Sequence, residues 1–434
     1  MRPIGIDLFS GVGGLSLGFE QAGFDVAAAV EIDPVHCAAH KFNFPNTAII
    51  PRSVEGLTGS EIRIAAGIGS RPVDCVFGGA PCQGFSLIGH RVLDDPRNGL
   101  VRDFVRIVAE LDARSFVFEN VRGLTVGRHK QFLHELVRTF EAEGYEVRMP
   151  WQVLNAARFG VPQSRERLVL MGVKRGTALP AYPEPTNRRH EGPTCQDALG
   201  DLPDAERYAT LISSDAVRTS ALGSDPSSYA AEMRCEAEEA WHFGYRRLWQ
   251  RDWLTSSART DHTDISRRRF RETEPGKIEP ISRLFKLAPD GLSNTLRAGT
   301  DGARGAFTSP RPIHYRYDRC VTVREMARLH GFPDWFRFNA TKWHGARQIG
   351  NAVPPPLARA VAAQIIAALG FTPERPADEV ALGAVDLLRM DVSTAAAHFG
   401  VPAPKSGRDR KSGARKRKQI DIEREQQAAR HANG

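Results

Sequence analysis

The chain has 434 residues, which is enough for one large domain and a smaller one. Its six cysteines form no CxxC pair and no His/Cys cluster with zinc spacing, so the sequence predicts neither a disulfide framework nor a metal site. The amino terminus has no basic region followed by an apolar stretch, and no window approaches about 18 apolar residues. We therefore expect a cytoplasmic protein without export or membrane insertion.

The formal net charge of +8 is distributed unevenly along the chain. Residues 405–418 carry eight Lys or Arg against one Asp, and residues 419–434 carry a net charge of −1. Residues 1–404 are therefore close to neutral, and the overall charge says little about what they bind. The basic run itself is typical of a disordered, salt-sensitive tether to nucleic acid.

Short apolar runs alternate with amphipathic helical stretches in the first part of the chain. Strands are predicted at 4–9, 26–32, 73–77, 116–119, 146–154 and 168–173, with helices such as 101–111 and 130–143 between several of them. This alternation is typical of an α/β protein with a doubly wound, mainly parallel sheet.

The remaining chain divides into three further parts. Residues 176–317 are rich in Pro, Ser and Arg with few periodic runs, which predicts a smaller, loop-rich domain after a first domain at 1–175. Residues 318–371 include a predicted helix at 356–369 and return to the first domain. The tail, 372–434, is expected to be partly helical at 386–401, in the manner of the first half of a helix-turn-helix, and then basic and disordered.

A glycine-rich turn follows the first predicted strand. Gly11, Gly13 and Gly14 let backbone N–H groups face a ligand at the amino end of a helix, although such glycines also occur in ordinary turns. Glu31 ends the next predicted strand, 24 residues after Asp7, where an acid commonly holds ribose hydroxyls. The loop does not spell Gly-x-Gly-x-x-Gly, which favours an adenosyl cofactor without a pyrophosphate.

Cys82 lies in a loop after the strand predicted at 73–77. Pro81 favours an extended backbone before it, and Gly79 and Gly84 allow close approach of a ligand. The loop is expected at the carboxyl edge of the sheet, where α/β enzymes bind their ligands. Taken alone, the cysteine could equally be a small buried apolar residue.

Two more polar clusters lie at predicted strand ends. Glu119 ends the strand predicted at 116–119. Partial burial there would raise the pKa of its carboxyl group and let it carry a proton near neutrality. Gln163, Arg165 and Arg167 occupy alternate positions and share one face if the segment is extended. Guanidinium groups there could bind a carbonyl or phosphate through paired hydrogen bonds. The alternative for Glu119 is an acidic residue in a solvated loop. The alternative for the segment 163–167 is a run of solvated charges.

In identity and order, these segments resemble the motifs of the DNA cytosine-C5 methyltransferases of bacterial restriction-modification type. The glycine loop, Pro-Cys-Gln, Glu-Asn-Val and Gln-x-Arg-x-Arg are followed by family-like segments at 319–334 and 348–355. The resemblance covers roughly residues 3–370, except for the middle of the second domain. It implies a Rossmann-like, S-adenosylmethionine-dependent methyltransferase sheet with a smaller target-recognition domain at 176–317.

The resemblance also implies a mechanism. Cys82 would add to C6 of a cytosine flipped out of duplex DNA and so activate C5 for methylation. Glu119 would hydrogen-bond N3 and the exocyclic amine, while Arg165 and Arg167 would steady the cytosine, its phosphate or the catalytic loop. Further substrate contacts are expected from Gln83, Ser86, Arg97, Gln163 and Arg297. Residues 84–99 are expected to close over the flipped base, with a static surface loop as the alternative.

For the cofactor, S-adenosylmethionine, the resemblance implies contacts from the glycine loop, the next strand ends and the last motif. The residues are Phe9, Gly11, Gly13, Gly14, Leu15, Glu31, Ile32, Val54, Pro81, Asn351 and Val353. Ile32 stands where the family often places an aromatic residue, and Ser53 where an acid often binds the adenine amine. The adenine contacts are therefore expected to be weaker or rearranged.

Double-stranded DNA is the expected partner, contacted by the arginine-bearing segments 259–264, 267–270 and 292–300. We expect a monomer in the bacterial cytoplasm, associated with the nucleoid, either paired with a restriction endonuclease of the same site or acting as an orphan methylase. Two alternatives remain open at this point. One is a transfer-RNA cytosine-C5 methyltransferase, and the other is a catalytically inactive, DNA-binding regulatory relative.

Overall fold

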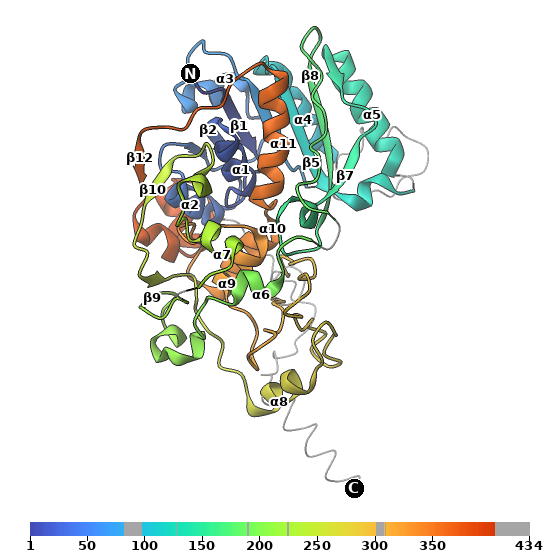
Figure 1. The fold of residues 1–434 in the computed structure, drawn as a ribbon. Coiled ribbons are helices and arrows are strands. Elements are labelled where there is room, and N and C mark those ends of the chain that lie inside the picture. The colour runs from blue at the N-terminus through green and yellow to red at the C-terminus, as the bar shows by residue number, and fades with distance from the viewer. Residues whose placement is uncertain are drawn as a thin grey trace, which may run out of the picture.

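The computed structural model describes residues 1–81, 98–127, 129–188, 191–223, 225–300, 308 and 310–403. An eight-stranded mixed sheet is its centre, in the order β3-β2-β1-β4-β5-β8-β6, with β7 also pairing with β8 (Figure 1). The strands are β1 (Ile4–Leu8), β2 (Asp25–Val30), β3 (Ala48–Ile50), β4 (Cys75–Gly78), β5 (Ser115–Val121), β6 (Tyr145–Val147), β7 (Gln152–Asn155) and β8 (Glu166–Lys174).

The first five strands are parallel, which confirms the predicted α/β class and the Rossmann-like methyltransferase sheet. β8 runs antiparallel to β5, and both β6 and β7 run antiparallel to β8. The single strand predicted at 146–154 is wrong, because β6 and β7 are separate. Pro150, which has no backbone N–H for a ladder hydrogen bond, lies between them.

Helices cover both faces of the sheet. The helices predicted at 101–111, 130–143 and 356–369 are confirmed as α4 (Gly99–Glu110), α5 (His129–Ala142) and α11 (Pro355–Ala368). The other helices are α1 (Gly14–Ala22), α2 (Pro34–Asn43), α3 (Gly59–Ala66), α6 (Cys195–Leu199), α7 (Ser228–Met233), α8 (Asp264–Glu272), α9 (Val323–His330), α10 (Lys342–Asn351) and α12 (Val392–His398).

On one face, α11 lies beside α1 (Figure 1). An added β-carbon at Gly18 of α1 would lie 2.3 Å from the β-carbon of Ala358, so only glycine permits this approach. Phe19 of α1 and Val361 and Ile365 of α11 belong to the apolar cluster between this helix pair and the sheet. Close packing therefore joins the return segment to the first domain.

The segment 176–317 shares its core with the rest of the protein. Leu199, Leu287 and Leu296 are buried in one cluster with Leu329 of α9 and Phe42 of α2. Short pairings complete this part: β9 (Val217–Arg218) with β11 (Trp253–Leu254), and β10 (Arg246–Leu248) with β12 (Glu379–Ala381). The division of the chain into four parts stays a proposal.

The described part of the tail packs on the first domain. A 3-10 helix (Val385–Arg389) and α12 both contact α2, and Leu388 is fully buried. The Ala340 N–H donates to the Leu388 carbonyl at 2.8 Å. The predicted basic tether lies outside the described residues. Among the residues described, no helix has the length and apolar character needed to cross a bilayer.

The buried guanidinium of Arg328 links α9 to Asp201 in the segment 176–317. The Arg328 guanidinium contacts Asp334 at 2.6 Å and 2.7 Å and Asp201 at 3.1 Å. We expect Arg328→Ala to lower the free energy of unfolding by about 3–5 kcal/mol, because two buried carboxylates would lose their cation. Urea denaturation measures this loss. The exposed Arg175→Ala should leave stability nearly unchanged, and a similar loss in both variants would contradict the prediction.

Candidate active site

The glycine loop between β1 and α1 adopts a backbone that favours glycine. Gly11 and Gly13 have φ angles of 55° and 98°, and Phe9 has a φ of 61°. Residues with a β-carbon rarely adopt such angles. An added β-carbon at Gly11 would meet no described atom within 4 Å, so the space beside Gly11 is open. The loop thus forms a cradle at the amino end of α1.

Glu31, after β2, spans this cradle. Its Oε2 accepts a hydrogen bond from the Gly11 N–H at 2.8 Å, and its Oε1 accepts one from the Asp33 N–H at 2.8 Å. An ionised carboxylate has further acceptor positions, so it can still accept hydrogen bonds from the hydroxyls of a ligand. The glycine loop and Glu31, both expected to bind the cofactor, are thus in direct contact.

The last motif meets the glycine loop from the other side. An added β-carbon at Gly14 would lie 2.4 Å from the Val353 carbonyl oxygen. Leu15 and Val353 are buried in one apolar cluster, whereas Asn351 is exposed. The fold therefore brings together residues that are more than 300 positions apart in the sequence.

The residues expected around an adenine differ in exposure. Ile32 is 65% exposed, whereas Val54 is buried and its carbonyl accepts a hydrogen bond from Arg106 at 3.1 Å. The loop segment 7–16 contains no Lys or Arg to neutralise a pyrophosphate. An open glycine backbone, a carboxylate and an exposed apolar side chain fit an adenosyl group without phosphates.

A carboxylate and a guanidinium meet at the carboxyl edge of the sheet. Arg167 Nε of β8 lies 2.7 Å from Glu119 Oε1 of β5, and both side chains are 13% exposed. Burial raises the pKa of Glu119, and the guanidinium groups of Arg167 and Arg165 oppose that increase. Glu119 is therefore held in place by a cation while its protonated form is favoured relative to a free glutamate.

The chain that leads toward Cys82 is fixed against this pair. An added β-carbon at Gly79 would lie 2.5 Å from Glu119 Oε2, and Asn120 Nδ2 donates to the Ala80 carbonyl at 2.9 Å. Pro81 is exposed at the end of the described segment. The predicted Cys82, Gln83, Ser86 and Arg97, and the predicted closing loop, lie outside the described residues.

Arg165 is 1% exposed and contacts the backbone of distant segments. Its Nη1 donates to the Leu296 carbonyl at 2.9 Å, and its Nη2 donates to the carbonyls of Gly350 at 2.8 Å and Ala352 at 2.9 Å. In this arrangement Arg165 holds the segments 176–317 and 318–371 together. It also interacts electrostatically with Glu119 and Arg167.

Gln163 extends the same network. Its Oε1 accepts from the Leu296 N–H at 3.0 Å, and its Nε2 lies 2.9 Å from His330 Nδ1. His330 Nε2 in turn lies 3.1 Å from the Ala352 carbonyl oxygen. Both side chains are fully buried, and sequence reasoning did not single out His330, which lies within the family-like segment 319–334.

Arg297 is exposed, and its backbone is closely packed. An added β-carbon at Gly350 would lie 2.4 Å from the Arg297 carbonyl carbon. The exposed side chain therefore projects from a segment that Arg165 and Gly350 hold against the first domain. Of the other expected arginines, Arg267 pairs with Glu206 at 2.7 Å, Arg269 lies 3.8 Å from Glu279, and Arg268 is exposed.

A buried polar cluster beneath the glycine loop was not predicted. Asp7, at the end of β1, accepts a hydrogen bond from Ser16 Oγ at 2.6 Å, and that oxygen lies 3.1 Å from His40 Nε2. Burial raises the pKa of Asp7 to about 8. The only signal in the sequence is an acidic residue that directly precedes the glycine turn.

Residues 4–367 match the family model of C-5 cytosine-specific DNA methylases. The chain belongs to this family. It is a DNA (cytosine-5)-methyltransferase, and the family's methyl donor is S-adenosylmethionine.

Relatives of this methyltransferase align over most of its length. Type II methyltransferase M.XorII of Xanthomonas oryzae pv. oryzae is 59% identical over 400 residues, which cover 92% of this chain and 93% of the relative. Type II methyltransferase M1.HphI of Haemophilus parahaemolyticus is 34% identical, with 83% and 86% covered. A crystal structure of a prophage-encoded protein described as a DNA modification methyltransferase (E. coli) aligns with a TM-score of 0.69 and 31% identity, covering 85% of this chain and 99% of that one.

The buried Asp7 should make the stability of the methyltransferase depend on pH. Its pKa is raised in the folded state, so the native protein keeps a proton that the unfolded chain loses above about pH 4, and stability falls as pH rises toward 8. Asp7→Asn should reduce that slope by up to about 1.4 kcal/mol per pH unit. Urea denaturation at several pH values tests this. The control, Asp386→Asn, is on the surface, and an unchanged slope in Asp7→Asn would contradict the prediction.

The contact between Gly79 and Glu119 gives a second prediction. Gly79→Ala would force the carboxylate away from Arg167, and we expect kcat to fall about 100-fold, as for a catalytic group displaced by about 1 Å. Affinity for S-adenosylhomocysteine should be retained. The matched control is Gly123→Ala, where an added β-carbon meets no described atom within 4 Å. Wild-type kcat in Gly79→Ala would show that Glu119 need not be held there.

Proposed function

We propose that this methyltransferase modifies C5 of a cytosine rotated out of duplex DNA, with Cys82 as nucleophile and Glu119 as the proton-carrying group. The observation that carries the proposal is the Glu119–Arg167 pair at 2.7 Å, against which Gly79, three residues before Cys82, is packed. A carboxyl group with a raised pKa is suited to donate a proton near neutrality.

The chemistry follows from the weak nucleophilicity of cytosine C5. The Cys82 thiolate adds to C6, and the electron pair of the C5–C6 double bond makes the ring an enamine that is nucleophilic at C5. Protonation or hydrogen bonding at N3 by Glu119 keeps negative charge from accumulating on the ring. The methyl group would leave the donor sulfur as it bonds to C5, and the N3 proton would return to Glu119. Loss of the C5 proton would then restore the C5–C6 double bond and expel the Cys82 thiolate.

Arg167 has a positioning role in this scheme. Its ion pair fixes the Glu119 carboxylate and lowers the electrostatic cost of ionisation after proton transfer. Arg165 acts one step further away, since its guanidinium is committed to the carbonyls of Leu296, Gly350 and Ala352. Arg165 would align the segment around Leu296, proposed for DNA recognition, and the segment 350–353, proposed for cofactor binding, relative to β8.

The cradle at the amino end of α1 would hold S-adenosylmethionine, which supplies an electrophilic methyl group bound to sulfur. Glu31 would accept the ribose hydroxyls, and Ile32 would cover the adenine. The backbone at Gly11, Gly13 and Gly14, together with Phe9, Leu15, Val54, Pro81, Asn351 and Val353, would line the rest. The 65% exposure of Ile32 supports this assignment, because an exposed apolar side chain beside Glu31 can pack on the face of a ring.

Sequence recognition would come from the segment 176–317. Arg297 is exposed on the packed segment beside Gly350, and an arginine in such a place can bind guanine O6 and N7 with two hydrogen bonds. The name Type II methyltransferase, carried by M.XorII and M1.HphI, supports protection of a specific site against a restriction endonuclease. We propose that the protein acts as a monomer and associates with the nucleoid through its DNA substrate.

Methyl transfer to duplex DNA and to transfer RNA, measured in parallel with labelled S-adenosylmethionine, tests the choice of substrate. We expect label in duplex DNA only, at C5 of cytosine within one short sequence. Label confined to transfer RNA would overturn the proposal. An absence of label in both, with retained cofactor binding, would favour the inactive regulatory relative.

The proposed nucleophile gives a direct prediction. Cys82→Ser should lose turnover below detection while S-adenosylhomocysteine binding, measured by calorimetry, stays within twofold of wild type. Glu119→Gln should lower kcat by about 10²–10⁴-fold, the usual contribution of a general acid. The control is Cys320→Ser, since Cys320 pairs with Ile313 in an isolated β-bridge outside the proposed site. Appreciable turnover in Cys82→Ser would refute the mechanism.

A further inference from the structure

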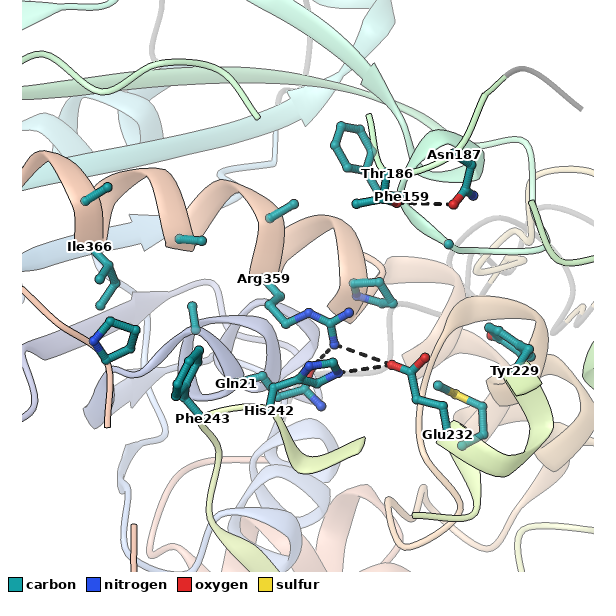
Figure 2. A pocket seen from close by; sticks show the side chains of 18 of the residues that line it. Gln21, Phe159, Thr186, Asn187, Tyr229, Glu232, His242, Phe243, Arg359 and Ile366 are labelled. Carbon is teal, nitrogen blue, oxygen red and sulfur yellow. Dashed lines mark hydrogen bonds and ion pairs between the residues drawn. The ribbon is translucent and has the colours of Figure 1, made fainter. Parts of the chain in front are cut away.

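A cavity of about 590 Å³ lies along α11, away from the candidate active site (Figure 2). It is bounded by the end of α1, the turn at Phe159–Gly160, α7 and the chain after α11. Its volume falls in the range of roughly 300–1,000 Å³ that is typical of small-molecule sites. None of its lining residues belongs to the candidate active site.

One end of the cavity carries a compact group of polar side chains. Glu232 Oε1 lies 3.0 Å from His242 Nε2 and 3.7 Å from Arg359 Nη1, and Arg359 Nη1 lies 3.4 Å from Gln21 Oε1. Figure 2 shows these side chains converging from α7, α11, α1 and the segment after α7. One cation and one anion therefore face the same space.

Both charged groups retain unused hydrogen-bonding capacity. The contacts of Arg359, at 3.4 Å and 3.7 Å, are longer than the 2.7–3.2 Å of a good N–H···O hydrogen bond. In the part of the chain that the structure describes, Glu232 contacts both His242 and Arg359 through Oε1, which leaves Oε2 available. Burial works against ionisation, but His242 and Arg359 hold the pKa of Glu232 below its ordinary value, so it is charged at neutral pH.

His242 occupies a backbone position that favours glycine. Its φ of 51° and ψ of −122°, with a Gly244 N–H to Trp241 carbonyl hydrogen bond of 2.9 Å, define a turn whose first central residue is usually glycine. A non-glycine residue is strained in this conformation. In this turn the His242 imidazole contacts Glu232 at 3.0 Å and so helps to hold the carboxylate in the cavity.

The other end of the cavity is apolar. Ala363, Ile366 and Phe371 line it from α11 and the chain that follows, and Phe243 and Pro373 also line the cavity. Figure 2 shows Phe243 and Ile366 on the same side of Arg359, away from Tyr229. The cavity thus combines an apolar space with a cation and an anion at one end.

We propose that this cavity binds an apolar α-amino acid, with its carboxylate on Arg359, its ammonium group on Glu232 and its side chain against Ala363, Ile366 and Phe371. Arg359 and Glu232 lie 3.7 Å apart, too far for a good hydrogen bond to each other, and a zwitterion can give each of them a closer partner of opposite charge. Because α1 runs from the glycine loop to Gln21 and Ala22 at the cavity, the amino acid site lies at the opposite end of α1 from the cofactor cradle.

Calorimetric titration with L-leucine tests the proposal. Saturating S-adenosylhomocysteine is present throughout, so that the cofactor cradle is blocked. Leucinol lacks the carboxylate, 4-methylpentanoate lacks the ammonium group, and L-aspartate lacks the apolar side chain. We expect L-leucine to bind at least tenfold more tightly than each of these three compounds. Absence of saturable L-leucine binding at millimolar concentration would overturn the proposal.

Variants of the cavity test which side chain binds the carboxylate, the ammonium group and the apolar side chain of the ligand. Arg359→Ala should bind L-leucine and leucinol equally, and Glu232→Gln should bind L-leucine and 4-methylpentanoate equally. Ala363→Trp should abolish binding by filling the apolar end, while Ala142→Trp, at an exposed position on α5, should not. Undiminished binding in Ala363→Trp would place the leucine elsewhere and contradict the proposal, even if a charge variant failed to fold.

Discussion

The antiparallel direction of β8 is the constraint on which the proposed active site depends. In a parallel sheet, residues that precede a strand lie at the opposite edge from residues that end the neighbouring strand. Because β8 reverses, Arg167 at its start pairs in register with Val121 at the end of β5, and Val169 pairs with Glu119. Arg167 is then a diagonal neighbour of Glu119, close enough for their 2.7 Å contact.

The same reversal places Arg165 and Gln163 where three distant parts of the chain meet. Arg165 binds carbonyls of the second segment and of the return segment, and Gln163 connects Leu296 to His330. Backbone carbonyls at a loop and a helix end lack partners of their own, and a buried guanidinium satisfies several at once. The segments 176–317 and 318–371 and the edge of the sheet that carries Glu119 are thereby held in one arrangement.

The sequence predicted the strand ends well and the roles of buried polar residues less well. Glu119 and Glu31 follow directly from apolar runs, so their places at the carboxyl edge could be read from the pattern. Gln163, Arg165 and Arg167 were expected on one face of an extended segment, but the antiparallel direction of β8 leaves no local signal in the sequence. The carbonyl partners of Arg165 are more than 130 residues away, and no spacing rule identifies them.

The proposed mechanism requires a covalent bond between Cys82 and cytosine C6 beside the Glu119–Arg167 pair. Duplex DNA with 5-fluorocytosine at the methylated position traps this bond, because a base can remove a proton from C5 but not fluorine, and the covalent intermediate persists. We expect a denaturation-resistant, cofactor-dependent complex whose cross-linked peptide, identified by mass spectrometry, contains Cys82. A cross-link at another cysteine, or no cross-link from a preparation that methylates the unmodified duplex, would contradict it.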